Sequence, residues 1–162
     1  ISIAEKERQL VDILQDEPEM QEFDVADLLK TVESRITAEH PDATLRIDCP
    51  DGITTTVCKK FDMAIEELIT NAIVHNDTEA PAVTVTVRST ADTVSIEVAD
   101  NGPLIPEMDQ AVLLPKRDRT PLYHGSGLGL SLVRVLTSRS NGTISINERS
   151  TEGNVIDLQL PE

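Results

Sequence analysis

The sequence predicts an α+β fold in which helices cover one face of a mixed, mostly antiparallel sheet. Its 162 residues suit one domain, and a hydrophobic share of 39% is typical of a globular chain. Aromatic residues make up only 2%, so the core is expected to be aliphatic. The order of the strand-like and helix-like patterns indicates the α+β class, because runs in which apolar and polar residues alternate surround a few stretches with helical spacing.

Two helices are expected before the first clear strand. Residues 3–17 carry apolar residues at helical spacing with charged residues between them, and Pro18 ends this helix. Asp24 is a suitable N-cap for the second helix, which has Asp27 in its first turn and stops before Pro41. The side chains expected to be buried on the second helix are Leu28, Leu29, Val32 and Ile36.

Two short strands and the strongest helix follow. Apolar residues alternate over residues 45–49, a turn is expected at 50–52, and the β-branched run 54–58 predicts another strand. Residues 60–76 form the strongest helix, because their apolar residues recur on one helical face. This face consists of Phe61, Ala64, Ile65, Leu68, Ile69, Ala72 and Ile73.

Two hairpins and one more helix complete the predicted fold. Residues 83–87 and 94–98 alternate strictly and are joined by a short polar link, which predicts a hairpin. Residues 143–147 and 155–160 have the same pattern and predict a second hairpin. Between the two hairpins, residues 128–140 have helical spacing.

The charge balance is strongly acidic, with a net charge of -15 from 29 acidic and 14 basic residues. Such a field repels nucleic acid and anionic membranes, so neither is expected as a partner. The acidity fits a solvated surface, either adapted to high salt or simply that of an ordinary acidic bacterial protein. No apolar run is long enough to cross a bilayer, and no signal peptide is visible. Because the chain starts at Ile1 rather than Met, we expect it to be cut from a longer protein.

Glu67, Asn71 and His75 lie four residues apart on the helix 60–76, so they stack on one line at the edge of its apolar face. A carboxylate and an amide oxygen on such a line can hold Mg²⁺, which prefers oxygen ligands and keeps several waters. A polar shoulder on an amphipathic helix would have the same spacing, so both interpretations stay open.

Asp100 ends the strand-like run 94–98 and is followed at once by Asn101 and Gly102. A carboxylate at a strand end can point into a pocket and accept a hydrogen bond from an amino group. The alternative is a plain turn, because Asp, Asn and Gly are the residues that turns prefer.

Gly125, Gly127 and Gly129 alternate immediately before the predicted helix 128–140. Glycine lets the backbone approach a ligand closely, and a helix N-terminus adds positive potential, so this segment has the properties of a phosphate cradle. Its spacing matches neither the dinucleotide fingerprint nor the Walker pattern. A flexible linker is the alternative.

A long loop, roughly residues 104–124, leads into these glycines and carries Lys116, Arg117, Arg119 and His124. Loops of this length within a compact domain are usually functional lids or disordered segments. Cations next to a phosphate cradle favour a lid, and a solvated charge cluster is the alternative.

Taken in this order, four segments resemble the motifs of the GHKL superfamily of gyrases, heat-shock chaperones, histidine kinases and MutL. ELITNAIVHND looks like the N box, VADNGPLIP like the first glycine box, HGSGLGLSLVRVL like the second, and EGNVIDLQLP like the closing strand. The resemblance covers residues 22–161. A short lid and the run Gly-Leu-Gly-Leu point to sensor histidine kinases, and the combined motifs are most similar to kinases of salt-loving archaea.

The resemblance implies a Bergerat-type two-layer sandwich that binds ATP with Mg²⁺. Asn71 would ligate the Mg²⁺, and Glu67 occupies the position of the general base in the ATP hydrolases of the family. Asp100 would accept a hydrogen bond from the adenine amino group, and Gly102 would let the ring lie against the backbone. The other residues expected to contact the nucleotide are His75, Ile105, Lys116, Arg117, His124, Gly125, Ser126, Gly127, Leu128, Gly129 and Asn154.

Three positions depart from the family pattern. Leu104 replaces the second glycine of the first box, and Val74 stands where many kinases have a lysine that contacts phosphate. Asn154 stands where a threonine often follows the third glycine. The first two departures bear on how tightly nucleotide binds, and cations of the 104–124 loop are expected to supply the missing positive charge.

The resemblance also divides the chain and implies partners. Residues 1–20 would be the C-terminal end of a dimerisation and phosphoacceptor hairpin, and residues 21–162 the catalytic ATP-binding domain. The domain would transfer the γ-phosphoryl of Mg-ATP to a histidine outside this fragment, on the same protein or its dimer mate. A response regulator would act downstream in this two-component signal transduction. The location would be cytoplasmic, as a free protein or as the cytoplasmic part of a membrane-bound sensor.

Three other functions stay open at the level of sequence. A degenerate domain could keep the fold and serve as a nucleotide-binding interaction module, which Leu104 and Val74 motivate. A GHKL-type ATPase could use Glu67 as its base. A protein-serine kinase of the anti-sigma type is the third.

Overall fold

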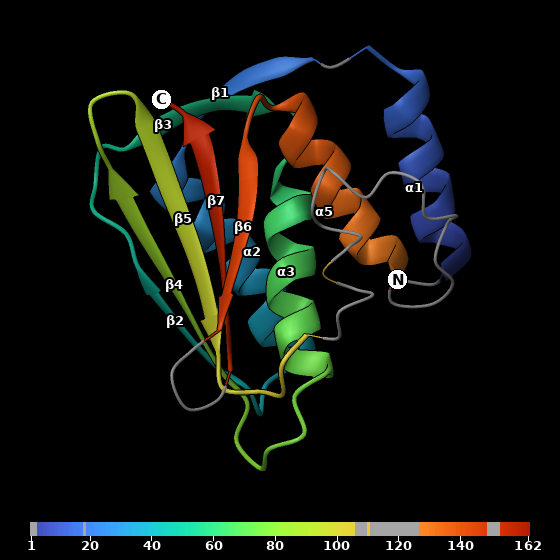
Figure 1. Ribbon diagram of the computed structural model, residues 1–162, viewed down its shortest axis with the longest axis vertical. Helices are drawn as coiled ribbons and strands as arrows, with labels where there is room; N and C mark the ends of the chain where they lie inside the picture. The colour runs from blue at the N-terminus through green and yellow to red at the C-terminus, as the bar shows by residue number, and fades with distance from the viewer. Residues whose placement is uncertain (1–2, 18, 106–109, 111–126, 149–152) are drawn as a thin grey trace.

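The computed structural model describes residues 3–17, 19–105, 110, 127–148 and 153–162. Within this part, a five-stranded sheet has the order β2-β4-β5-β7-β6 (Figure 1). Its strands are β2 (Thr44–Asp48), β4 (Ala82–Ser89), β5 (Thr93–Asp100), β7 (Asn154–Pro161) and β6 (Thr143–Glu148). Only β2 and β4 pair in parallel, and the other three pairs are antiparallel. The predicted mixed, mostly antiparallel sheet with two hairpins is therefore confirmed.

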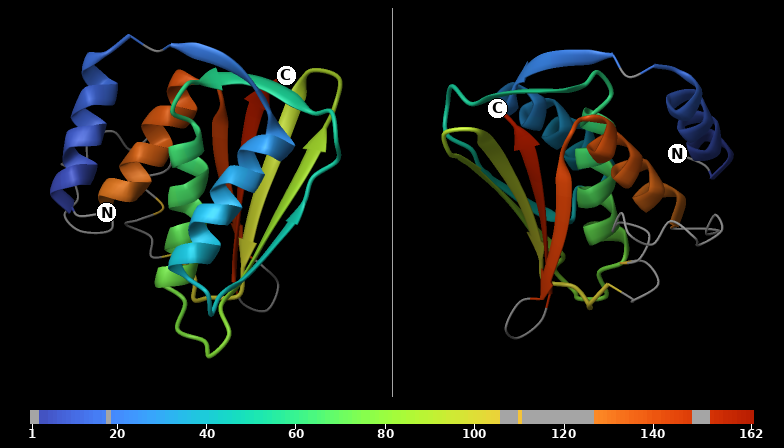
Figure 2. Two further views of the ribbon diagram at one scale, coloured as in Figure 1. Left: turned by 180° about the vertical axis from the view of Figure 1, so that it is seen from behind. Right: turned by 45° about the horizontal axis from the view of Figure 1, so that its top comes forward.

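Three helices cover one face of this sheet and complete the expected α+β architecture (Figure 2). They are α2 (Val25–Glu39), α3 (Asp62–Val74) and α5 (Gly127–Arg139). The predicted N-cap of α2 is confirmed, because the Asp24 Oδ1 atom accepts a hydrogen bond from the Asp27 backbone N–H at 3.1 Å. The helix ends differ by one or two residues from those predicted, as the last turns of helices commonly do.

A small second sheet corrects the sequence-based prediction. β1 (Met20–Asp24) pairs antiparallel with β3 (Thr54–Cys58), separately from the main sheet. Only the second of these strands was expected. Four of the five residues of β1 are exposed and none is buried, so this strand has no apolar face whose alternation could reveal it.

The core between the sheet and the helices is aliphatic, as the composition predicts. Val94, Ile96 and Val98 point from β5 toward the helices and are at most 2% exposed. Ile65 and Ile69 of α3 are fully buried on the other side of the same core. This packing fixes α3 against β5, and so sets where the polar residues at their ends lie.

α1 (Ile3–Gln15) lies beside α5 on the outer side of the helical layer (Figures 1 and 2). Leu10 and Ile13 are buried in the contact. The Arg139 guanidinium, at the end of α5, donates hydrogen bonds to the backbone carbonyls of Ile13, Leu14 and Asp16. These are carbonyls that the end of a helix leaves without partners, so Arg139 fixes the end of α1.

Every helix in the described part of the chain falls short of the length and apolar character that a membrane span needs.

Candidate functional site

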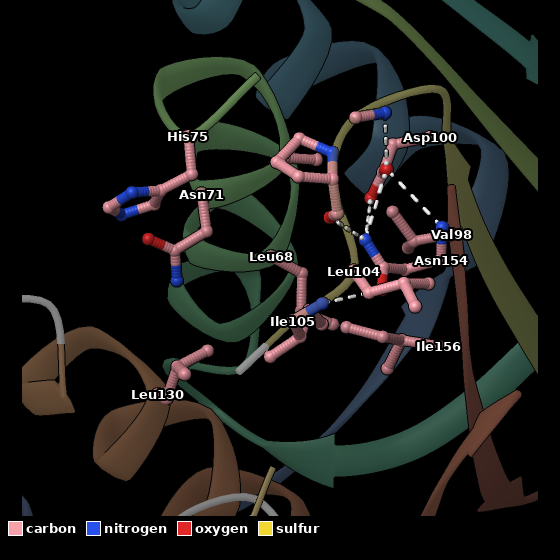
Figure 3. Close-up of a pocket in the computed structure, with 13 residues that line it drawn as sticks. Leu68, Asn71, His75, Val98, Asp100, Leu104, Ile105, Leu130, Asn154 and Ile156 are labelled. Carbon is pink, nitrogen blue, oxygen red and sulfur yellow. Dashed lines mark hydrogen bonds between the residues drawn. The ribbon is translucent and has the colours of Figure 1, made fainter. Parts of the chain in front are cut away.

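A cavity of about 350 Å³ lies between α3 and the end of β5 (Figure 3). Its volume suits a small-molecule ligand. The walls are mostly apolar, and a few polar groups converge on the space. The lining residues are Leu68, Asn71, Ala72, His75, Val98, Asp100, Gly102, Pro103, Leu104, Ile105, Leu130, Asn154 and Ile156.

Asp100 provides a buried carboxylate on the sheet side of the cavity. It is 6% exposed, and the antiparallel register of β5 and β7 places it next to Asn154. Its Oδ1 atom accepts hydrogen bonds from the Gly102 N–H at 2.9 Å, the Asn154 N–H at 3.4 Å and Asn154 Nδ2 at 3.2 Å. These donors offset the cost of burying the carboxylate and fix its orientation.

The Asn154 carboxamide joins Asp100 to the segment after β5 (Figure 3). Its Nδ2 atom also donates to the Pro103 carbonyl at 2.8 Å, and its Oδ1 atom accepts from the Ile105 N–H at 2.8 Å. Both ends of a 4% exposed amide are therefore satisfied. The departure from threonine at this position has a structural reason, since only an amide combines these donors with an acceptor.

We expect Asn154→Ala to lower the free energy of unfolding by about 2–4 kcal/mol, because it removes a side-chain donor to the buried Asp100 and the side-chain partner of the Pro103 carbonyl and the Ile105 N–H. Chemical denaturation followed by circular dichroism measures this. Asn147→Ala, on an exposed position of β6, is the matched control and should stay within about 0.5 kcal/mol of the wild type. Equal midpoints for the two variants would contradict the role given to Asn154.

Asn71 and His75 face the cavity from α3, opposite Asp100 and Asn154 (Figure 3). The Asn71 Nδ2 atom is buried and has no hydrogen-bond partner within the described structure. A buried amide N–H group without a hydrogen-bond acceptor is unfavourable, so this group is suited to a ligand that supplies an acceptor. His75 is the C-cap residue of α3.

Glu67 does not join Asn71 and His75 at the cavity. Its side chain faces α1 and α5, and its Oε2 atom lies 3.3 Å from the Lys6 Nζ atom. The three polar residues that were predicted to lie on one line therefore do not share one environment. Asn71 and His75 line the cavity, whereas Glu67 lies where α1 and α5 pack beside α3. No apolar pattern could indicate this division, and Lys6 was not expected near the site.

The end of α3 is tied to the segment after β5 by two asparagines that the sequence did not single out. The Asn76 Nδ2 atom donates to the Asn101 Oδ1 atom at 2.6 Å, which also accepts from the Ala82 N–H at 3.0 Å. A Cβ atom on Gly102 would lie 3.2 Å from Asn76 Nδ2, so a side chain here would require Asn76 to shift by a few tenths of an ångström. Both asparagines lie in stretches that look like turns, which is the only signal that they give.

The glycine motif is partly within the described structure. Helix α5 begins at Gly127, one residue before the predicted start at 128, so Gly127, Leu128 and Gly129 all lie in its first turn. The other predicted contacts in this region lie outside the described residues, namely Lys116, Arg117, His124, Gly125 and Ser126.

The other two departures from the family pattern, Leu104 and Val74, have different surroundings. Leu104 lines the cavity and is 48% exposed. Val74 is 59% exposed and is not part of the cavity wall, so it neither closes the cavity nor replaces a group inside it.

A divalent metal would find few protein ligands here. The described residues contain no group of three or more His, Cys, Asp or Glu side chains that could hold a metal ion. Mg²⁺ commonly takes one or two protein oxygens, and its other ligands are waters and substrate phosphates. The Asn71 carboxamide lines the cavity and could offer one oxygen in this pattern, and its unpartnered Nδ2 atom could donate to a phosphate or water oxygen.

Known proteins with the same sequence pattern share this fold. Residues 56–162 match the profile of the family described as "Histidine kinase-, DNA gyrase B-, and HSP90-like ATPase". The sensor-type histidine kinase PrrB of Mycobacterium tuberculosis is 29% identical over 141 residues, which are 85% of this chain and 31% of PrrB. The sensor-like histidine kinase SenX3 of the same organism is 26% identical over 152 residues, 89% of this chain and 37% of SenX3. The chain thus spans about a third of these relatives.

Solved structures agree on the fold. The ATP-binding domain of PrrB from Mycobacterium tuberculosis superposes with a TM-score of 0.68 at 24% identity, covering 90% of this chain and 98% of that domain. The histidine kinase ThkA, solved in complex with the response regulator TrrA, superposes with a TM-score of 0.75 at 18% identity and covers 98% of this chain and 47% of that one. The profile match covers well over half of the sequence, and the chain therefore belongs to the histidine kinase-, DNA gyrase B- and HSP90-like ATPase family.

Proposed function

We propose that this chain is the ATP-binding catalytic domain of a sensor histidine kinase and passes the γ-phosphoryl group of Mg-ATP to a histidine elsewhere. The buried Asp100 carboxylate, held by Asn154 at the edge of the 350 Å³ cavity, carries this proposal. A fixed carboxylate in a mostly apolar cavity suits a flat base with one amino group. That the sequence relatives are sensor histidine kinases supports the same conclusion.

In the proposed reaction, the adenine ring lies in the cavity and its amino group donates to Asp100. The phosphates extend toward Asn71 and the first turn of α5, whose N–H groups and positive helix end suit anions. The acceptor imidazole attacks the γ-phosphorus, a P–N bond forms, and the bond to the β-phosphate oxygen breaks with its electrons leaving on ADP. This reaction needs orientation and charge neutralisation more than covalent help from the protein.

Mg²⁺ is the metal that the Asn71 carboxamide oxygen would hold in this proposal, and when bound it would neutralise phosphate charge. The chain would contribute one ligand, and the phosphates and water the others. The predicted cations Lys116, Arg117 and His124 would add positive charge in a protein whose overall charge of -15 opposes a triphosphate.

The partners are proposals as well. The acceptor histidine would belong to a preceding hairpin of the same protein or its dimer mate, of which α1 would be the end, and a response regulator would take the phosphoryl group. The solved complex of ThkA with a response regulator is consistent with this. A cytoplasmic location and adaptation to high salt remain predictions from composition and resemblance.

The proposed activity is tested on a chain that includes the natural sequence upstream of Ile1. Incubation with γ-³²P-ATP and Mg²⁺ should label it with acid-labile, alkali-stable phosphohistidine, and Asn71→Ala in the same chain should remove most of the label. A longer chain that binds ATP but never carries this label would instead support a degenerate nucleotide-binding module.

A further inference from the structure

We propose that Lys6 is a positioning residue that holds the Glu67 carboxylate against the first turn of α5 and thereby keeps Glu67 from catalysing ATP hydrolysis. This inference rests on the proposed function, since it concerns ATP bound in the cavity described above. The Lys6 Nζ and Glu67 Oε2 atoms lie 3.3 Å apart, and their side chains are only 22% and 12% exposed. A partly buried pair is screened less than one at the surface.

Glu67 lies one helical turn before Asn71 on α3, so it is close enough to the proposed phosphate position to matter. A free carboxylate there can take a proton from water while the water oxygen bonds to the γ-phosphorus and ADP leaves, which yields ADP and inorganic phosphate. In the described structure the Glu67 carboxylate is instead paired with Lys6 beside the first turn of α5, so it is not free to act as a base. It lines a separate cavity of about 430 Å³, together with Gln9 of α1 and Leu132 of α5.

Gly129 makes the position of Glu67 possible. A Cβ atom at residue 129 would lie 2.5 Å from Glu67 Oε2, which is closer than side chains pack, so the carboxylate would have to move. The absence of a side chain at residue 129 therefore leaves the space that the Glu67 carboxylate occupies beside Lys6. The carboxylate also gains from the positive potential at the start of α5.

Lys6 reaches this space because the C-terminal half of α1 is fixed against the helical layer. Leu10 and Ile13 are buried against the helical layer, and Arg139 binds the carbonyls at the end of α1. The pair thus connects the helix that precedes the domain with a carboxylate beside the ATP site. In the intact protein, a shift of α1 would remove Lys6 and release Glu67.

Phosphate release from Mg-ATP by chain 1–162, without any acceptor, tests this role. We expect Lys6→Met to raise the rate about 100-fold, which is the lower end of what a positioned general base contributes. The increase should vanish in the double variant Lys6→Met/Glu67→Gln, whereas Lys6→Arg should keep the low wild-type rate. Lys59→Met, which removes an exposed ion pair with Glu19, is the matched control and should also behave as wild type.

The affinity for a fluorescent ATP analogue, measured for each variant, separates the two proposals. If Lys6→Met binds the analogue like the wild type but releases phosphate no faster, the role of Lys6 is wrong and the proposed function stands. The role is equally wrong if the faster release persists without the Glu67 carboxylate. If the folded wild type binds no ATP analogue at all, the proposed function is wrong and the inference about Lys6 falls with it.

Discussion

Asp100→Asn is expected to weaken ATP binding by about 30- to 150-fold, equivalent to about 2–3 kcal/mol. The substitution replaces one carboxylate oxygen with an NH₂ group. The new NH₂ group is a donor, and it would face either the Gly102 and Asn154 donors or the adenine amino group, each of which is a donor too. A buried donor facing a donor loses its hydrogen bond without compensation. The preference for ATP over GTP should fall with the affinity.

Competition of ATP and GTP against a fluorescent ATP analogue measures both quantities. Asp157→Asn is the matched control, because Asp157 is a partly buried aspartate on β7 that accepts from Ser95 Oγ and Gln159 Nε2 away from the cavity. It should change neither the affinity nor the base preference. If Asp100→Asn kept the wild-type preference for ATP over GTP, Asp100 would not be the group that recognises adenine.

Asn71→Ala is expected to remove most of the contribution of Mg²⁺ to ATP binding. The carboxamide at residue 71 has a buried nitrogen without a partner within the described structure, so its loss costs the protein little internal bonding. The substitution should instead lower the affinity for Mg-ATP by about 10- to 100-fold. Binding of ATP in EDTA should change much less.

Calorimetric titrations with and without Mg²⁺ measure this difference, and Asn147→Ala on β6 again serves as the control. An equal loss of affinity in Mg²⁺ and in EDTA would show that Asn71 acts on the nucleotide without the metal. Unchanged affinity in both conditions would remove Asn71 from the binding site.

Local patterns in the sequence predicted most of the fold. The hairpins were predictable because buried and half-buried residues alternate along their strands, as Val94, Ile96 and Val98 do on β5, and burial on one face of a sheet produces that alternation. The strand Met20–Asp24 could not be predicted in this way, since it buries no side chain and is held by backbone pairing to β3. Which strand would pair with it depends on the tertiary fold.

The candidate site was predictable to a smaller extent. Asp100 and Asn71 could be singled out because a polar group at a strand end or beside an apolar helical face needs an explanation. Their neighbours could not, since Asn154 meets Asp100 only through the pairing of β5 with β7. Helical spacing placed Glu67 in line with Asn71, but the packing of α1 and α5 decides which way its carboxylate points.

Binding of Mg-ATP to the cavity between α3 and β5 is the claim on which the other proposals depend. Titration of chain 1–162 with a fluorescent ATP analogue tests it directly, in molar KCl so that the repulsion by a net charge of -15 is screened. We expect saturable binding of one analogue per chain, strengthened by Mg²⁺, displaced by ATP and much weaker in Asp100→Asn. A folded chain that shows no binding up to millimolar analogue, or equal binding by Asp100→Asn, would contradict it.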